Sequence, residues 1–173
     1  DFIAEAVNVV LVGPNGVGKS LIAQNLAHQA VLQGHSACFV NAAQMLGDLA
    51  AQDGDNALRR RFAHYARPDV LVIDEIGYLS YGTRHADLLF EIVNRRYERK
   101  PTIITTNRPF AEWSEVFPNA ACVVSIVDRL IHHAEILVIE GESYRMHEAK
   151  QRAARKTTAK SRKRRDRSTD NGD

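Results

Sequence analysis

Eight residues near the start of the chain form a loop whose composition suits phosphate binding. They follow the apolar run 9–12 and read, in order, Gly13, Pro14, Asn15, Gly16, Val17, Gly18, Lys19 and Ser20. In the pattern G-x-x-x-x-G-K-[ST], glycines let the backbone curl around an anion, so that successive N–H groups point at it. Lys19 is then placed to reach the β- and γ-phosphates of a nucleotide, and Ser20 to offer its hydroxyl to Mg²⁺. The alternative is a glycine-rich turn, but strand and helix patterns on either side favour the phosphate-binding loop.

Two adjacent carboxylates, Asp74 and Glu75, follow the apolar run 70–73. This arrangement is typical of the Walker B motif. We expect Asp74 to hold the Mg²⁺ shell and Glu75 to orient and deprotonate the attacking water. Alone the pattern is weak, because Asp often caps helices that follow strands. Downstream of a complete phosphate loop, the Walker B interpretation is favoured over a helix cap.

Asparagines end two further apolar runs. Asn41 follows residues 37–40, and Asn107 follows residues 102–106. The carboxyl ends of parallel strands meet at one edge of a sheet, so both side chains are expected beside the phosphate loop. Asn107 could hydrogen-bond the water or the γ-phosphate. The alternative for Asn107 is a turn-forming residue before Arg108 and Pro109.

Short apolar runs alternate with helical patterns along the chain. The expected strands are 7–12, 37–40, 69–73, 102–107 and 136–139, and the expected helices include 20–33, 42–51, 58–65, 86–97 and 119–133. Strands without polar alternation are typical of a parallel sheet that is covered on both faces. We therefore predict an α/β fold with a doubly wound parallel five-stranded sheet and ligands at the carboxyl ends of its strands. Trp113 is expected in the core.

Composition limits the class of protein. A chain of 173 residues with 45% hydrophobic and 25% charged residues fits one globular domain. No apolar run approaches the roughly 20 residues of a membrane helix and no signal peptide is evident, so we expect a cytoplasmic protein without membrane contact. Cys38 and Cys122 lie in apolar stretches and are expected as buried thiols. His132 and His133 are adjacent and diverge by about 100° on a helix, which favours ordinary helix positions.

Positive charge is concentrated at the end of the chain. The net charge is +2, but residues 145–173 carry +7. We expect residues 1–148 to form the folded domain and 149–173 a basic, disordered tail that contacts an anionic polymer; a merely solvated tail is the alternative. A competing DNA-binding surface consists of arginines in the folded part: Arg59, Arg60, Arg61, Arg95 and Arg96.

Several short blocks occur in a characteristic order: 74–79, 86–90, 96–99, 106–110, 128–133 and 141–145. Together they resemble the IstB family. These are AAA+ ATPases that insertion sequences encode as helpers of a DDE transposase, and they are related to DnaC-type helicase loaders. The resemblance covers residues 2–147.

The resemblance implies a P-loop AAA+ domain that hydrolyses ATP, assembles as a homo-oligomer on double-stranded DNA, selects target sites and stimulates the transposase. It also implies three residue roles. Asn107 corresponds to the sensor asparagine, Arg129 to an arginine finger that acts on the neighbouring subunit, and Asn41 to a polar switch that restrains Glu75. Arg145 is a candidate for the sensor role of a lid arginine.

Two departures from the family pattern are expected. The sequence begins close to the first strand, which leaves out the amino-terminal region that the family carries. Too few apolar residues follow the last strand for a developed helical lid. The alternative function is a DnaC-type helicase loader in DNA replication. A transport-type ATPase is disfavoured, because no Leu-Ser-Gly-Gly signature separates the two Walker motifs.

Overall fold

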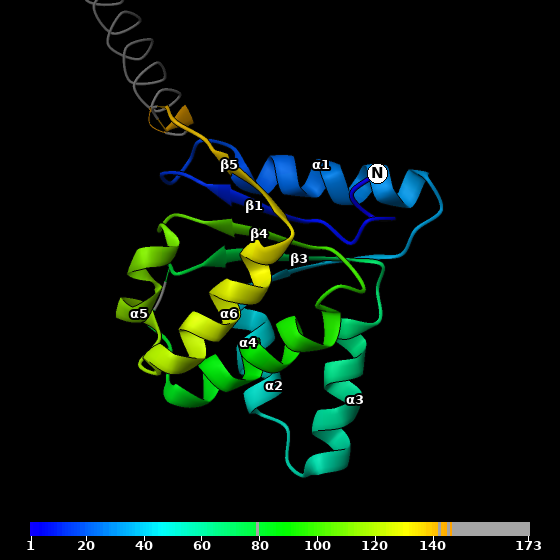
Figure 1. Ribbon diagram of the computed structural model, residues 1–173, viewed down its shortest axis with the longest axis vertical. Helices are drawn as coiled ribbons and strands as arrows, with labels where there is room; N and C mark the ends of the chain where they lie inside the picture. The colour runs from blue at the N-terminus through cyan, green and yellow to red at the C-terminus, as the bar shows by residue number, and fades with distance from the viewer. Residues whose placement is uncertain (79, 142, 145, 147–173) are drawn as a thin grey trace, which may run out of the picture.

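The computed structural model describes residues 1–78, 80–141, 143–144 and 146. In chain order, its elements are β1 (Asn8–Val12), α1 (Lys19–Leu32), β2 (Ala37–Asn41), α2 (Ala42–Ala50), α3 (Asp55–Ala66), β3 (Val70–Ile76), α4 (Thr83–Arg96), β4 (Thr102–Thr106), η1 (Phe110–Glu112), α5 (Trp113–Val116), α6 (Ala120–His132) and β5 (Ala134–Val138). The strands form one parallel sheet in the order β2-β3-β4-β1-β5 (Figure 1). The predicted α/β fold is confirmed.

One face of the sheet is covered by α1 (Figure 1). Ala23, Ala27 and Ala30 recur at helical spacing on this helix and are buried against the sheet. Their small side chains let the helix axis approach the apolar side chains of β1 and β3, including Val9 and Val72.

The opposite face carries the larger core, under α2 to α6 (Figure 1). Met45 and Leu49 of α2, Ile92 of α4 and Ile126 of α6 are all fully buried there. Trp113 is also completely buried, as predicted. The helices therefore flank the sheet on both sides, which is the doubly wound arrangement.

The two edge strands differ from the prediction of strands buried on both faces. In β5, Ile136, Leu137 and Val138 are 47%, 48% and 67% exposed, and β2 is only half buried. The prediction was wrong here because an apolar run does not show whether its strand lies at the centre or at the edge of the sheet. Strand β5 also begins at Ala134, two residues earlier than expected.

The strand order brings the chemistry-bearing residues to one edge of the sheet. Strand β4 separates β1 from β3, and Asn41 at the end of β2 is in register with Asp74. A register shift between Ile73 and Ile76 interrupts the pairing of β3 with β4. Asp74 and Glu75 therefore lie in an irregular part of β3 rather than in a regular ladder.

Some predictions fall on residues outside the described part of the chain. They concern the basic tail at 149–173, the boundary at residue 148, the missing lid and Arg145. Among the described residues, no helix has both the length and the apolar character needed to span a membrane.

Candidate functional site

The loop between β1 and α1 curls around the Lys19 ammonium. Gly16 and Gly18 have φ values of 85° and 95°, which glycine adopts without a Cβ clash. Lys19 begins α1 and is buried, and its Nζ donates to the carbonyl oxygens of Gly13 and Pro14 at 2.8 Å each. Strand, loop and helix thus follow one another as the motif requires.

A short segment after β5 packs against this loop. The backbone N–H of Tyr144 donates to the carbonyl oxygen of Gly16 at 3.0 Å. A Cβ at Gly16 would lie 2.2 Å from Oγ of Ser143. The segment with Ser143 and Tyr144 therefore supports the conformation of the loop. Local sequence patterns do not predict this contact.

Ser20 and Asp74 meet directly, although 54 positions separate them in the chain. Oγ of Ser20 donates to Oδ1 of Asp74 at 2.8 Å, and Oγ1 of Thr105 donates to the same oxygen at 2.5 Å. A hydroxyl and a carboxylate are hard oxygen ligands, the kind that Mg²⁺ prefers beside phosphates. The residues present therefore fit the predicted ion, with Ser20 and Asp74 as its holders.

Glu75 has an unusual backbone and a specific partner. Its φ is 63°, in the left-handed region that non-glycine residues seldom adopt. Its N–H donates to Oγ1 of Thr105 at 2.8 Å, and its exposed carboxylate accepts from Nδ2 of Asn41 at 2.8 Å. Oδ1 of Asn41 caps α2 by accepting from the Ala43 N–H, which leaves the amide nitrogen facing Glu75. The cap thus determines which atom of Asn41 meets the carboxylate.

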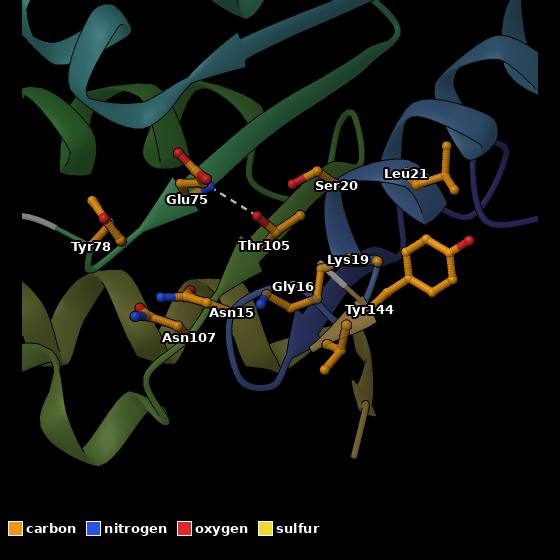
Figure 2. Close-up of a pocket in the computed structure, with 12 residues that line it drawn as sticks. Asn15, Gly16, Lys19, Ser20, Leu21, Glu75, Tyr78, Thr105, Asn107 and Tyr144 are labelled. Atoms are coloured by element: carbon orange, nitrogen blue, oxygen red, sulfur yellow. Dashed lines mark hydrogen bonds between the residues drawn. The ribbon is translucent and has the colours of Figure 1, made fainter. Parts of the chain in front are cut away.

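Lys19, Ser20, Glu75 and Thr105 line a cavity of about 660 Å³. Figure 2 shows side chains from the loop, from β3 and from β4 that line it. The lining residues are Asn15, Gly16, Val17, Gly18, Lys19, Ser20, Leu21, Glu75, Tyr78, Thr105, Asn107 and Tyr144. The volume is of the size that small-molecule sites have, and the polar groups are few and convergent.

Asn107 lies in this lining, as expected from its place after β4. Its Oδ1 is buried and has no hydrogen-bond partner among the described residues. A buried amide oxygen of this kind is costly unless a donor reaches it. Asn107 therefore offers an acceptor for a donor that enters the cavity.

The sequence missed Thr105, Tyr78, Leu21 and Tyr144 as cavity residues. A contact of Thr105 could have been predicted, because a threonine in a fully buried strand needs a hydrogen-bond partner for its hydroxyl. Leu21 and Tyr144 are each 70% exposed, and nothing in their sequence context distinguishes them from ordinary surface residues.

Arg129 lies outside the lining of the cavity. Its guanidinium carbon is 4.8 Å from the centre of the Phe90 ring and 5.8 Å from that of Tyr97, both on the α4 side, and Nη1 donates to the carbonyl oxygen of Ser125 at 3.1 Å. The structure therefore does not bring Arg129 together with Lys19 and Glu75 of the same chain.

The arginines proposed as a DNA-binding surface do not form a uniform group. Arg96 is 1% exposed, and burial lowers its pKa to about 10, so its place in that surface was wrong. Arg61 pairs with Asp48, and Arg95 pairs with Glu91. Arg59 and Arg60 remain exposed.

Comparisons with known proteins show the family of the chain. The family model for IstB-like ATP binding protein matches residues 1–153. An ATP-binding protein of insertion sequence IS21 from Pseudomonas aeruginosa is 40% identical over 147 residues, which is 85% of this chain and 56% of the relative. The corresponding protein of IS5376 from Geobacillus stearothermophilus is 35% identical, over 85% of this chain and 59% of the relative.

Solved structures share the fold at lower identity. A DnaC helicase loader superposes with a TM-score of 0.66 at 22% identity, over 80% of this chain and 84% of that one. AMPPCP-bound DnaA from Aquifex aeolicus gives 0.65 at 20% identity, over 86% of this chain and 46% of that one. The chain thus shares its fold with these two proteins, in agreement with the expected P-loop AAA+ fold.

The chain spans somewhat more than half the length of these insertion-sequence relatives. Within that span, the family match runs from the first residue through the whole sheet and includes the phosphate loop, the Asp74–Glu75 pair and Asn107. The chain belongs to the IstB-like ATP-binding protein family.

Proposed function

We propose that this chain binds and hydrolyses ATP with Mg²⁺ and acts on double-stranded DNA as the helper of a DDE transposase. The observation that carries the ATPase proposal is the hydrogen bond between Ser20 of the loop and Asp74 of β3, beside Glu75. It joins the two motifs that ATP hydrolysis needs at one end of one cavity. The insertion-sequence relatives support the transposition role.

Each residue has a distinct part in the proposed reaction. The loop N–H groups and Lys19 bind the β- and γ-phosphates. Ser20 and Asp74 would hold Mg²⁺, which would supply positive charge beside the phosphate oxygens. Glu75 takes the proton of the attacking water, and Asn107 orients that water. Glu75 must first release the Asn41 amide, so Asn41 restrains hydrolysis.

Arg129 is proposed to act on the γ-phosphate of a neighbouring subunit. This role requires a homo-oligomer, and it agrees with the position of Arg129 outside its own cavity. Assembly on double-stranded DNA would then link hydrolysis to target-site selection. The alternative, a helicase loader, rests on a likeness in fold at 22% identity, and such a likeness does not extend to function.

Two variants test the ATPase proposal. Lys19→Ala is expected to abolish binding of a fluorescent ATP analogue, because it removes the charge that compensates the phosphates. Glu75→Gln is expected to retain binding and to lower turnover roughly 10²- to 10⁴-fold, the usual contribution of a general base. Glu91→Gln, a helical glutamate that pairs with Arg95, is the matched control and should behave as the parent.

The parent and the same variants also test whether the partner is a transposase or a replicative helicase. In a strand-transfer reaction with a DDE transposase from an insertion sequence that encodes a relative of this chain, the parent and Glu91→Gln should stimulate product formation on duplex DNA, whereas Lys19→Ala should not. Stimulation of replicative-helicase loading, with no effect on the transposase, would favour the loader. Full turnover by Glu75→Gln would remove Glu75 from the catalytic role.

A further inference from the structure

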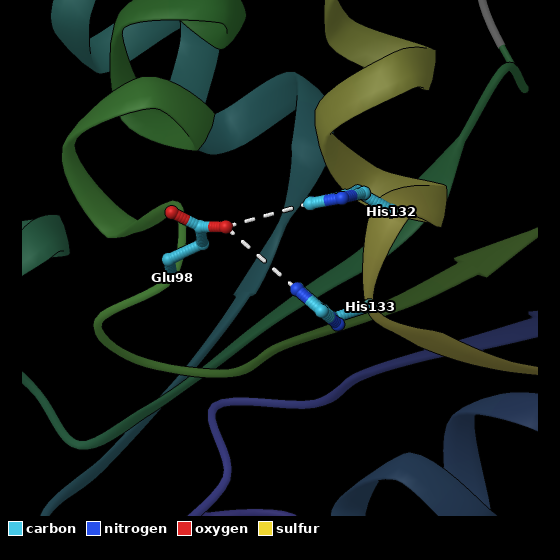
Figure 3. Close-up of side chains that lie close together, drawn as sticks. All are labelled: Glu98, His132 and His133. Carbon is cyan, nitrogen blue, oxygen red and sulfur yellow. Dashed lines mark ion pairs between the residues drawn. The ribbon is translucent and has the colours of Figure 1, made fainter.

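Glu98, His132 and His133 come together where strands β4 and β5 begin, at the edge of the sheet opposite to the cavity (Figure 3). Oε1 of Glu98 lies 3.6 Å from Nδ1 of His132 and 3.7 Å from Nε2 of His133. One donor atom from each residue can be chosen so that all three lie within 4.8 Å of one another. The sequence predicted ordinary helix positions for both histidines and gave no sign of Glu98 beside them.

This donor set has the chemistry of a transition-metal site. Two imidazole nitrogens and one carboxylate oxygen are ligands that Zn²⁺ takes at about 2.0–2.2 Å, with a fourth position open to water or another donor. Ligand atoms around such an ion lie roughly 3.3 Å apart, as tetrahedral geometry at those bond lengths requires. The separations from Glu98 to each histidine are already within about half an ångström of that value.

The backbone on the histidine side is fixed by a buried asparagine. The N–H of Asn8 donates to the carbonyl oxygen of His133 at 2.8 Å, and its Nδ2 donates to that of Leu130 at 3.0 Å. Oδ1 of Asn8 accepts from the N–H of Thr102 at 2.8 Å. The end of α6 is thereby tied to the starts of β1 and β4.

The backbone on the glutamate side is fixed by Arg96. Its side chain donates to the hydroxyl of Thr102 and to four carbonyl oxygens, among them that of Pro101. Its carbonyl oxygen accepts the N–H groups of Arg99 and Lys100, which closes the turn around Glu98. Glu98 itself has φ 55°, a left-handed conformation that a non-glycine residue keeps only when its surroundings impose it.

Thr102 thus connects the hydrogen bonds of Asn8 with those of Arg96, and the backbone on both sides of the cluster is held in one network. Sites in which supporting groups fix the ligands in advance bind metal with less ordering of the side chains on binding. We propose that Glu98, His132 and His133 bind a divalent transition-metal ion of the Zn²⁺ class. The proposal concerns a second site and is independent of the proposed ATPase function.

Tyr97 links this site to Arg129. Its Oη lies 2.7 Å from Nδ1 of His132, the same nitrogen that faces Glu98. A ring nitrogen accepts either a hydrogen bond or a metal ion, so metal binding through Nδ1 releases the tyrosine hydroxyl. The Tyr97 ring packs against the guanidinium of Arg129. The ion would therefore sit next to the arginine proposed to serve the neighbouring subunit.

The test is titration of the whole chain with Zn²⁺ by calorimetry, and with Co²⁺ as a probe whose visible absorption reports tetrahedral coordination by nitrogen and oxygen. Glu98→Gln and His133→Gln are each expected to weaken binding roughly tenfold or more, because loss of an outer-shell partner alone costs 10- to 100-fold. His28→Gln is the matched control, an exposed histidine on α1, and should leave binding unchanged.

The melting temperature of each variant is measured by circular dichroism. We expect it to equal that of the parent, because the substituted side chains are exposed. Unchanged Zn²⁺ affinity in both Glu98→Gln and His133→Gln would overturn the proposal and leave the cluster as a solvated ion pair. Equal losses in the control and the two test variants would also overturn it, since binding would then reflect histidine content.

Discussion

At the scale of single residues, the site depends on one hydroxyl that no motif includes. Thr105 is fully buried, donates to Asp74 and accepts from the Glu75 N–H. It therefore sets both the direction of the Asp74 carboxylate and the backbone position of Glu75. Ser20 and Asp74 share this network and were predictable, because their motifs have fixed local spacing.

Thr105→Val is expected to lower ATP turnover at least tenfold with a smaller loss of ATP affinity. The isosteric valine removes the donor to Asp74 and leaves the part-buried Glu75 N–H without its partner, which destabilises the fold by about 1 kcal/mol. Steady-state kinetics, analogue binding and thermal melts measure the three effects. Thr105→Ser keeps the hydroxyl and should retain most of the turnover; equal turnover of Thr105→Val and parent would contradict the positioning role.

Site residues could be predicted from the sequence where their function depends on local spacing. They could not be predicted where their function depends on contacts made by the fold. Lys19 and Glu75 belong to contiguous motifs, so their positions could be predicted. Asn41 could be given a role only through family resemblance, because its contact with Glu75 spans 34 positions. The meeting of Glu98 with His133 depends on how α4 and α6 end, which no local pattern encodes.

At the scale of elements, one carboxylate ties together the amino ends of three strands. Asp69 precedes β3 and accepts from the N–H and Oγ of Ser36, before β2, at 2.9 and 2.8 Å. It also accepts from Nζ of Lys100, before β4, at 3.1 Å. The hydrogen bonds from Ser36, followed by that from Lys100, hold the pKa of Asp69 well below its usual range.

This depressed pKa predicts a pH-dependent contribution to stability. The native state favours ionised Asp69, so the stabilisation is complete above the ordinary aspartate pKa of about 3.9 and is lost as pH falls below it. The melting temperature of Asp69→Asn should therefore lie below that of the parent at pH 7, with the gap narrowing as pH falls through about 4. Asp53→Asn, in the exposed α2–α3 loop, is the control. A gap that stays constant down to pH 2 would contradict the linkage.

The elements also show why strand prediction succeeded unevenly. Strand β3 is apolar from Val70 to Ile73 and lies inside the sheet, so the burial predicted from its sequence was confirmed. The residues from Ile136 to Val138 in β5 are also apolar, but this strand lies at the edge of the sheet. Their exposure follows from strand order rather than from composition. Strand order is decided by long-range pairing, which the periodicity of single segments does not contain.

At the scale of the whole molecule, the cavity and Arg129 lie towards opposite edges of the sheet. The cavity is at the carboxyl ends of β1, β3 and β4. Arg129 lies near the end of α6, directly before β5, whose first residue pairs with Asn8 at the start of β1. In its proposed role, an arginine in this position would serve a second copy of the chain in a head-to-tail assembly.

Mixing variants tests this arrangement. Lys19→Ala should be inactive alone because it does not bind ATP. Arg129→Ala should be inactive alone because an arginine finger contributes about 10³-fold or more to turnover. Mixed, they should recover part of the ATPase activity, because some interfaces pair an intact cavity with an intact Arg129. The measurement is turnover across mixing ratios in protein shown by light scattering to assemble. No recovery at any ratio would exclude action in trans.

The left-handed backbone of Glu75 lowers the stability of the fold, whereas its carboxylate is needed for the proposed reaction. A residue with a Cβ costs roughly 1–2 kcal/mol in that conformation, whereas glycine adopts it freely. Selection for thermal stability alone would thus favour glycine at this position, and glycine would remove the proposed catalytic base. At Glu75, selection for stability and selection for activity therefore favour different residues. We expect that a search for stabilised variants of this protein will find substitutions of Glu75 that raise the melting temperature and abolish ATP turnover.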